Sequence, residues 1–103
     1  MREANKETIK KIREMYEKAG YECKDEFPIV RENKNLKDIK VGKIDICCKK
    51  EDIINCFEVE DSQKQALQNE RDLKRVKNQY SKKGYNVGVC HLASGENVEE
   101  VCK

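Results

Sequence analysis

Apolar residues recur at helical spacing at the start of the chain. The positions that fall on one helix face are Ala4, Ile9, Ile12, Tyr16 and Ala19. Gly20 follows them, and glycine commonly ends a helix because it adopts the left-handed conformation at no steric cost. The pattern predicts an amphipathic helix over residues 2–19.

The next part of the chain contains strand-like runs. Residues 21–30 read as a strand that is interrupted around Pro28, and residues 31–43 are polar and lysine-rich, which indicates a loop or the arm of a hairpin. Residues 41–48 and 53–59 are β-branched and apolar, and the polar KKED at residues 49–52 separates them. This spacing predicts a hairpin of two strands.

The second half alternates between helix and strand. Ser62 reads as an N-cap, and Gly84 ends the helix that follows it. The apolar stripe of this helix consists of Ala66, Leu67, Leu73, Val76 and Tyr80. Residues 85–92 read as another apolar strand, and residues 95–103 hold a short helix. The chain therefore ends with a helix, a strand and a helix.

The predicted order is helix, three strands, helix, strand and helix. If the third and fourth strands are parallel, the helix between them is a crossover connection. The fold class is then α/β, with a mixed central sheet flanked by helices. A chain of 103 residues has the size of one domain, so we expect residues 1–103 to form a single fold.

Composition excludes some classes of protein. Charged residues make up 41% of the chain, but the 22 basic and 20 acidic residues nearly cancel to a net charge of +2, which argues against a polybasic binder. The apolar runs are far shorter than the roughly 20 residues that span a bilayer, and the N-terminus lacks the apolar core of an export signal. We expect a soluble, cytoplasmic protein that does not insert into a membrane.

Six cysteines raise the question of disulfides. They are Cys23, Cys47, Cys48, Cys56, Cys90 and Cys102. No CxxC pair is present, so the usual zinc spacing is absent. The sequence also lacks an export signal, which argues against a framework of disulfides. We therefore expect free or buried thiols that pack as small hydrophobes.

Three acids lie inside the predicted hairpin, in the stretch GKIDICCKKEDIINCFEVED. Asp45 and Glu58 can lie close together on adjacent strands, and alternation puts Glu60 on the same face as Glu58. Carboxylates that converge repel one another unless they share a cation, and oxygen ligands suit Mg²⁺ or Mn²⁺. The alternative is that these acids line a solvated edge and pair with some of the basic residues.

The arrangement resembles the PD-(D/E)xK nuclease superfamily, which includes restriction enzymes and archaeal Holliday-junction resolvases. Its members share a restriction-endonuclease-like core of helix, three strands, helix and strand, with an Asp in the second strand and a (D/E)xK tripeptide in the third. Here Asp45 of GKIDI and Glu58-Val59-Glu60 of FEVED match these positions. The resemblance implies that Asp45, Glu58 and the Val59 carbonyl bind Mg²⁺ or Mn²⁺.

The chain departs from the motif at its last position, where Glu60 replaces the lysine. Lys43, two residues before Asp45, or Lys64, in the following helix, could supply the missing positive charge. Family members often add an acid from the first helix. Glu7 is preferred over Glu3 for that place, and the alternative is that both are ordinary surface residues.

A nuclease must also hold a polyanion. Lys34, Lys37 and Lys40 recur every three residues before the acidic strand, and Lys74 and Lys77 lie in the second helix. Basic residues beside an acidic metal site suit the phosphate backbone. The alternative for the helix lysines is that they complement the helix dipole and increase solubility. The lone His91 is interpreted as a hydrogen-bonded residue and not as a catalyst.

These features lead to two functional hypotheses. The first is a metal-dependent nuclease that hydrolyses DNA phosphodiester bonds, as an endonuclease or a resolvase-like enzyme, and cutting two strands would suit a homodimer. The second is a non-catalytic nucleic-acid-binding module on the nuclease fold, which Glu60 in the lysine position favours. A protein-interaction domain with a charged surface is the third alternative.

Overall fold

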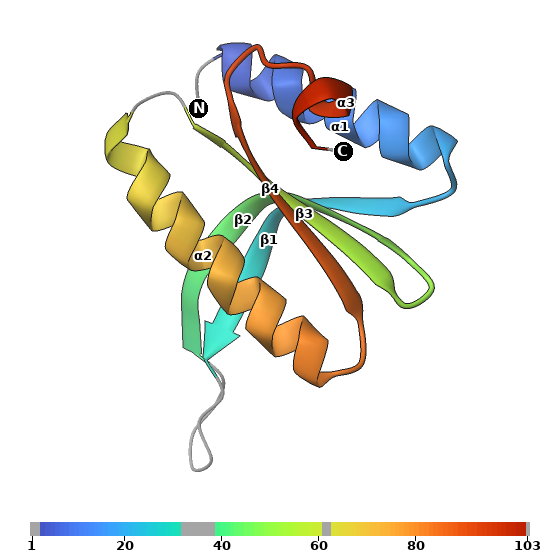
Figure 1. Ribbon diagram of the computed structural model, residues 1–103, viewed down its shortest axis with the longest axis vertical. Coiled ribbons are helices and arrows are strands. Elements are labelled where there is room, and N and C mark those ends of the chain that lie inside the picture. Colours follow the sequence, from blue (N-terminus) through green and yellow to red (C-terminus); the bar gives the residue numbers. More distant parts are fainter. Residues whose placement is uncertain (1–2, 32–38, 61–62, 103) are drawn as a thin grey trace.

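Seven elements follow one another in the computed structural model, which describes residues 3–31, 39–60 and 63–102, and side chains at 5–30, 42–60 and 67–102 (Figure 1). They are α1 (Glu3–Lys18), β1 (Glu22–Arg31), β2 (Ile39–Lys50), β3 (Ile53–Glu60), α2 (Gln63–Lys82), β4 (Asn86–Ala93) and α3 (Val98–Val101). The predicted order of elements and the α/β class are confirmed.

The four strands form one mixed sheet in the order β1-β2-β3-β4. The pairs β1–β2 and β2–β3 are antiparallel, and β3–β4 is parallel, so α2 is the crossover connection that the sequence predicts. In Figure 1, α1 and α3 lie together on one face of the sheet and α2 on the other. None of the described helices is long and apolar enough to span a membrane.

Each face of the sheet carries its own apolar core. The first core joins α1 and α3 to the sheet through Ile9, Ile12, Ile46, Cys48, Phe57, Val59, Leu92 and Val98. The second joins α2 to the sheet through Ile29, Ile44, Cys47, Ile54, Cys56, Leu73 and Val76. Side chains alternate along β3, so this strand contributes residues to both cores. Each fully buried aliphatic or aromatic side chain stabilises the folded state by about 1.5–3 kcal/mol.

The hairpin of β1 and β2 turns over at Glu26 and Asp45. In β2, Ile46 packs in the first core, whereas Ile44 packs in the second, although residues two apart share a face in a regular strand. Glu26 has a φ of 49°, and the register resumes beyond it with Phe27 opposite Ile44. The hairpin arm therefore presents its apolar side to α2 beyond this point.

Pro28 does not interrupt β1, which corrects the sequence-based expectation. It pairs with Lys43 inside the ladder, and the irregularities lie on either side of it, at Glu26 and between Ile29 and Val30. β1 is an edge strand, so the missing N–H of proline costs no ladder hydrogen bond if it faces outward.

The sequence predicts a loop or the arm of a hairpin over residues 31–43, and the described part of this segment, residues 39–43, belongs to a hairpin arm. Strand β2 already begins at Ile39, and Lys40 pairs with Val30 of β1. The segment can be polar because pairing within the hairpin arm does not need apolar side chains on both faces. Lys34 and Lys37 lie outside the described residues.

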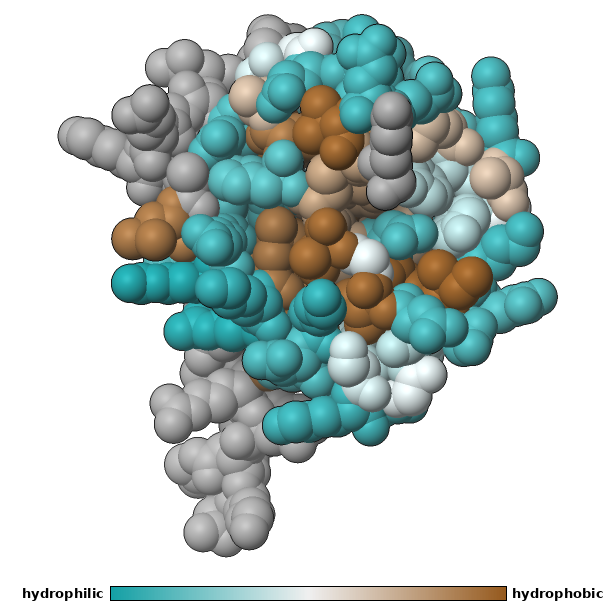
Figure 2. All heavy atoms as spheres, in the orientation of Figure 1, coloured by the Kyte–Doolittle hydropathy of each residue, from teal (hydrophilic) through white to brown (hydrophobic). Residues whose placement is uncertain are grey.

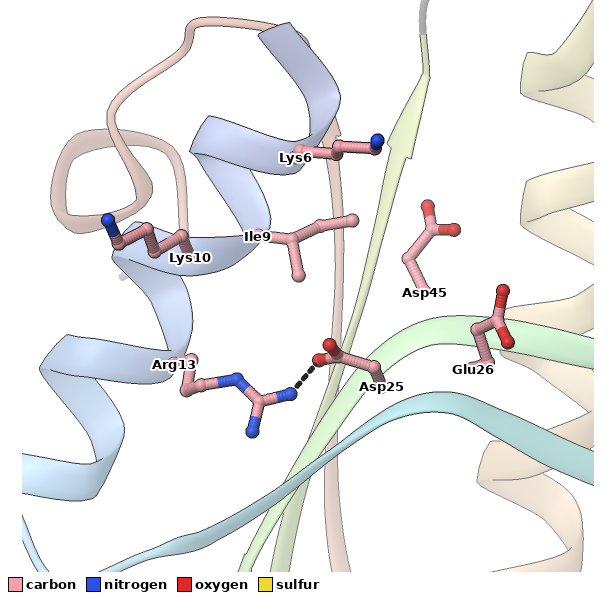
Figure 3. Close-up of a pocket in the computed structure, with 7 residues that line it drawn as sticks. All are labelled: Lys6, Ile9, Lys10, Arg13, Asp25, Glu26 and Asp45. Carbon is pink, nitrogen blue, oxygen red and sulfur yellow. Dashed lines mark ion pairs between the residues drawn. The ribbon is translucent and has the colours of Figure 1, made fainter. Parts of the chain in front are cut away.

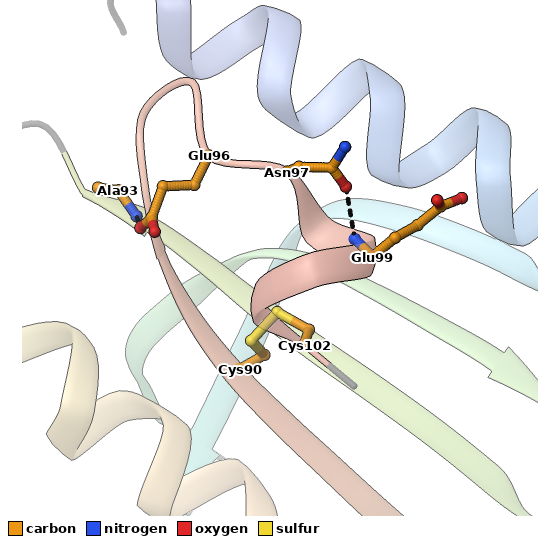
Figure 4. Close-up of a disulfide and its surroundings, with 6 residues drawn as sticks. All are labelled: Cys90, Ala93, Glu96, Asn97, Glu99 and Cys102. Carbon is orange, nitrogen blue, oxygen red and sulfur yellow. Dashed lines mark hydrogen bonds between the residues drawn. A yellow bond between two sulfur atoms is a disulfide. The ribbon is translucent and has the colours of Figure 1, made fainter.

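Two disulfides correct the expectation of free thiols. Cys23 and Cys48 are cross-strand partners in the β1–β2 register, with Cα atoms 4.0 Å apart, and they form one disulfide. Cys90 and Cys102 form the other, which ties the end of α3 to β4 (Figure 4). Register and helix docking bring these pairs together, and neither is visible in sequence spacing.

Cys47 and Cys56 remain free and buried, as the sequence predicts. They are register partners on β2 and β3, and their side chains are hydrogen-bonded. Burial, followed by the contact with Cys56, raises the pKa of the Cys47 thiol far above its ordinary value. The thiol is therefore protonated and packs as a small hydrophobe.

The short helix α3 is held by local hydrogen bonds as well as by its disulfide (Figure 4). The Asn97 side chain caps it by accepting a hydrogen bond from the Glu99 backbone N–H at 2.8 Å. Just before it, the Ala93 N–H donates to the Glu96 carboxylate at 2.6 Å. These contacts fix the path of the chain from β4 into α3.

The disulfide pairing predicts how many thiols react with an alkylating agent. After denaturation without reductant, iodoacetamide should label Cys47 and Cys56 only, and after reduction it should label all six cysteines. Replacing Cys90 and Cys102 together by serine should lower the free energy of unfolding by about 2–4 kcal/mol. Mass spectrometry counts the labels and denaturant titration gives the stability. Six labels without reductant would contradict the pairing.

Candidate functional site

Asp45 and Glu58 are joined where β2 separates from β3. The ladder between these strands runs from Lys50 opposite Ile53 to Ile46 opposite Phe57, and continuing it would oppose Asp45 to Glu58. Instead, the Asp45 N–H donates to Glu58 Oε1 at 2.6 Å. In return, the Val59 N–H donates to Asp45 Oδ2 at 2.8 Å.

This exchange satisfies backbone groups that the diverging strands would otherwise leave without a ladder partner. A buried N–H without an acceptor costs about 1–3 kcal/mol, so each carboxylate stabilises the other strand at the point where the ladder stops. The predicted proximity of Asp45 and Glu58 is thus present in the structure.

Glu58 is the more deeply placed of the two acids, with only 3% of its surface exposed. Burial, followed by the negative charge of Asp45, raises its pKa to about 8. The hydrogen bond from the Asp45 N–H and the charge of Lys43 oppose this rise. In the absence of a cation, Glu58 is mainly protonated at neutral pH.

A third carboxylate approaches from α2. Asp72 is 6% exposed, accepts a hydrogen bond from the Gln68 amide at 3.0 Å, and lies close enough to Glu58 to raise the pKa of that acid. Gly42 on β2 makes room for it, because a Cβ there would lie 3.1 Å from Asp72 Oδ1. Sequence reasoning missed Asp72, although its place four residues before Val76 on the apolar stripe signals burial.

Glu60 lies on the same face of β3 as Glu58 and contacts His91 of β4. Its Oε2 lies 3.2 Å from His91 Nε2, and the Asn69 amide nitrogen lies 3.4 Å from the same ring nitrogen. A protonated Nε2 can donate to Glu60, whereas an unprotonated Nε2 can only accept from Asn69. His91 is thus a hydrogen-bonded residue between β4 and α2, as the sequence indicates.

A pocket of about 520 Å³ lies between α1 and the β1–β2 hairpin (Figure 3). Its lining residues are Lys6, Ile9, Lys10, Arg13, Asp25, Glu26 and Asp45. Arg13 forms an ion pair with Asp25 across it, and Glu26 pairs with Lys43 at 3.1 Å. Asp45 therefore borders an open space, whereas Glu58 is buried beside it.

The other residues predicted for the site lie in varied places. The Val59 carbonyl accepts a hydrogen bond from the buried Asn5 amide at 3.5 Å. Glu7 is exposed and is not part of the pocket lining, where its neighbour Lys6 lies instead. Lys43 forms an ion pair with Glu26, and its charge also lowers the pKa of Glu58, so it lies near the two acids.

The predicted nucleic-acid-binding lysines are spread over several elements. Lys74 and Lys77 are exposed on α2, and Lys74 lies 3.7 Å from Glu70. Lys40 belongs to β2 and Lys64 to α2, but their side chains lie outside the described part of the structure. The structure brings neither Lys74 nor Lys77 into the pocket beside Asp45.

Among the described residues, no three His, Cys, Asp or Glu side chains are grouped so that they could hold a metal ion. Asp45 and Glu58 could contribute two oxygen ligands, and water or a substrate oxygen commonly completes the coordination of Mg²⁺. Comparison of the chain with protein-family models, with curated proteins and with solved structures finds no match.

The raised pKa of Glu58 predicts that the metal-free protein loses stability as pH increases. Between its ordinary value of 4.5 and about 8, the folded state keeps a proton that the unfolded state has released. The free energy of unfolding should then fall by up to about 1.4 kcal/mol per pH unit in this range. Glu58→Gln should remove this slope, and denaturant titrations from pH 4.5 to 8.5 measure it.

The matched control is Glu22→Gln, which changes an exposed acid on β1. It should leave the pH dependence as it is in the wild-type protein. An equal slope in wild type and Glu58→Gln would show that Glu58 is ionised throughout.

Proposed function

We propose that the chain is a metal-dependent nuclease of the PD-(D/E)xK type, which hydrolyses DNA phosphodiester bonds with Mg²⁺ or Mn²⁺. The observation that supports it best is the pair Asp45 and Glu58, held together by reciprocal hydrogen bonds with Asp45 open to a pocket. The α/β fold, with its order of helix, three strands, helix and strand, agrees with this proposal.

Asp45 and Glu58 would have different roles in binding the cation. Asp45, accessible from the pocket, would bind a divalent cation, and Glu58 would join it by losing the proton that burial favours. A bound Mg²⁺ or Mn²⁺ supplies the acidity that activates water and stabilises charge on a phosphate. The Val59 N–H holds Asp45 in place, so its carboxylate needs no reorientation.

A second candidate function is a nucleic-acid-binding module that does not cut. Two observations favour it. Glu60 takes the motif position where the superfamily has lysine, and it lies beside His91. In addition, the described side chains include no group of three potential metal ligands. Such a module would bind DNA with a strong dependence on salt and without a need for metal.

A homodimer of the proposed nuclease could use the edge strand β4. This strand contains no Lys, Arg, Asp or Glu, whereas the other edge strand, β1, carries charged residues and Pro28, which discourage pairing. Figure 2 shows apolar side chains on the side of the molecule that carries β4 and α3 in Figure 1. Val89 of β4 and Val101 of α3 are 37% and 42% exposed. A second copy of the same uncharged edge would bring no like charges together.

We place this function in the cytoplasm, in keeping with a DNA substrate. Disulfides are rare in the cytosol of mesophiles, but intracellular proteins of hyperthermophiles are rich in them. The two disulfides and a composition with 41% charged residues suit such a source.

Cleavage assays test the proposed function directly. At least one substrate among supercoiled, linear, single-stranded and branched DNA should be cut in Mg²⁺ or Mn²⁺ and remain intact in EDTA. Asp45→Asn and Glu58→Gln keep the shapes of the side chains but remove their charges, and each should lower kcat by at least about 100-fold. Gel electrophoresis measures the products, and thermal melting shows that the variants fold.

Glu17→Gln, an exposed acid on α1, is the control and should cut at the wild-type rate. Cleavage that survives both site substitutions would contradict the assignment of the site. Salt-dependent DNA binding without cleavage would contradict the nuclease and support the non-catalytic binding module.

A further inference from the structure

The pocket beside Asp45 has a basic wall that was not singled out in the sequence. Lys6, Lys10 and Arg13 lie at successive turns of α1, and all three contribute to its lining. Figure 3 shows Lys6 extending from α1 toward Asp45 and Arg13 reaching across to Asp25, whereas Lys10 points away from Asp45 at the rim. The opposite wall is acidic and comes from β1 and β2.

The charges of the two walls are only partly neutralised by one another. Arg13 is paired with Asp25, and Glu26 is paired with Lys43, which lies outside the pocket lining. Within the described residues, no carboxylate forms an ion pair with Lys6. Its ammonium group therefore presents a positive charge to the space in front of Asp45.

We propose that this pocket binds one phosphate group of a DNA backbone, with Lys6 as the main contact and with the phosphate sharing a divalent cation with Asp45. This inference rests on the proposed function. It adds which group of the substrate binds in the pocket, a backbone phosphate, and which residue contacts that group, Lys6. A volume of about 520 Å³ accommodates a phosphate together with part of the attached nucleotide.

The opposite charges of the two pocket walls favour a phosphate that binds together with a cation over a single anion or a single cation. A bare anion beside Lys6 would meet the negative charge of Asp45, and a bare cation beside Asp45 would meet Lys6. A phosphate that arrives with a divalent cation would satisfy both walls, because Asp45 would offer an oxygen ligand to the cation and the Lys6 ammonium would donate to phosphate oxygens.

Binding of a labelled DNA duplex at a fixed concentration of Ca²⁺, which keeps a divalent cation available to Asp45 in place of Mg²⁺ or Mn²⁺, tests the inference. Fluorescence anisotropy measures the binding over a range of NaCl concentrations. Lys6→Ala should reduce the slope of log K against log salt by about 0.9, the value for one lost phosphate contact. Lys6→Arg should keep the wild-type slope, because it retains the charge. Lys6 is exposed and Ala is a better helix former, so the variant should fold.

Lys11→Ala is the matched control, because Lys11 is exposed on α1 but lines a different pocket, beside Glu96 and Val98. It should lower the slope less than Lys6→Ala. Competition by a mononucleotide or by inorganic phosphate separates the two sources of a phosphate group. A ligand that is free phosphate would compete as well as DNA does, and this result would overturn the assignment to the backbone.

The outcomes separate this inference from the proposed function. If the wild-type protein cuts DNA and Lys6→Ala leaves both the slope and the rate unchanged, the phosphate site is wrong and the nuclease stands. If the slope depends on Lys6 but no DNA is cut, the phosphate site stands and the nuclease is wrong. If the wild-type protein neither binds nor cuts DNA, both are wrong.

Discussion

The reciprocal hydrogen bonds between Asp45, Glu58 and the backbone hold the centre of this fold together. They replace the ladder at the point where β2 leaves β3, 2.6 Å from the Asp45 N–H to Glu58 and 2.8 Å from the Val59 N–H to Asp45. Because β2 is fixed at Asp45, where its ladder with β3 stops, the β1–β2 hairpin can turn over and pack Ile44 against α2 while Ile46 remains against α1. The same turnover places Asp45 at the pocket.

These acids therefore combine a structural and an electrostatic role, and the two are in tension. The backbone N–H groups favour ionised carboxylates, whereas burial and mutual repulsion raise the pKa of Glu58 to about 8. Protonation of Glu58 relieves the repulsion when no cation is present. A divalent cation would relieve it in another way, and the positive charge of Lys6 across the pocket suits an anion that arrives with that cation.

Periodicity in the sequence was sufficient to predict the element order, the mixed sheet and the proximity of Asp45 and Glu58, because all three depend on alternation and short connections. It could not predict the turnover at Glu26, since regular alternation assumes an even twist. Cys23 and Cys48 paired because of register, which the sequence does not encode locally. Lys6 was overlooked because a helix lysine is usually solvated, and only the packing of α1 shows which turn faces the site.

Proton release on metal binding tests the central claim that Asp45 and Glu58 share a cation. Titration calorimetry with Mn²⁺ at pH 7, in buffers that differ in ionisation enthalpy, counts the protons released. With the pKa of Glu58 at about 8, the account predicts that nearly one proton leaves for each ion bound, and that Glu58→Gln abolishes the release. Absence of Mn²⁺ binding, or binding without proton release in the wild-type protein, would contradict it.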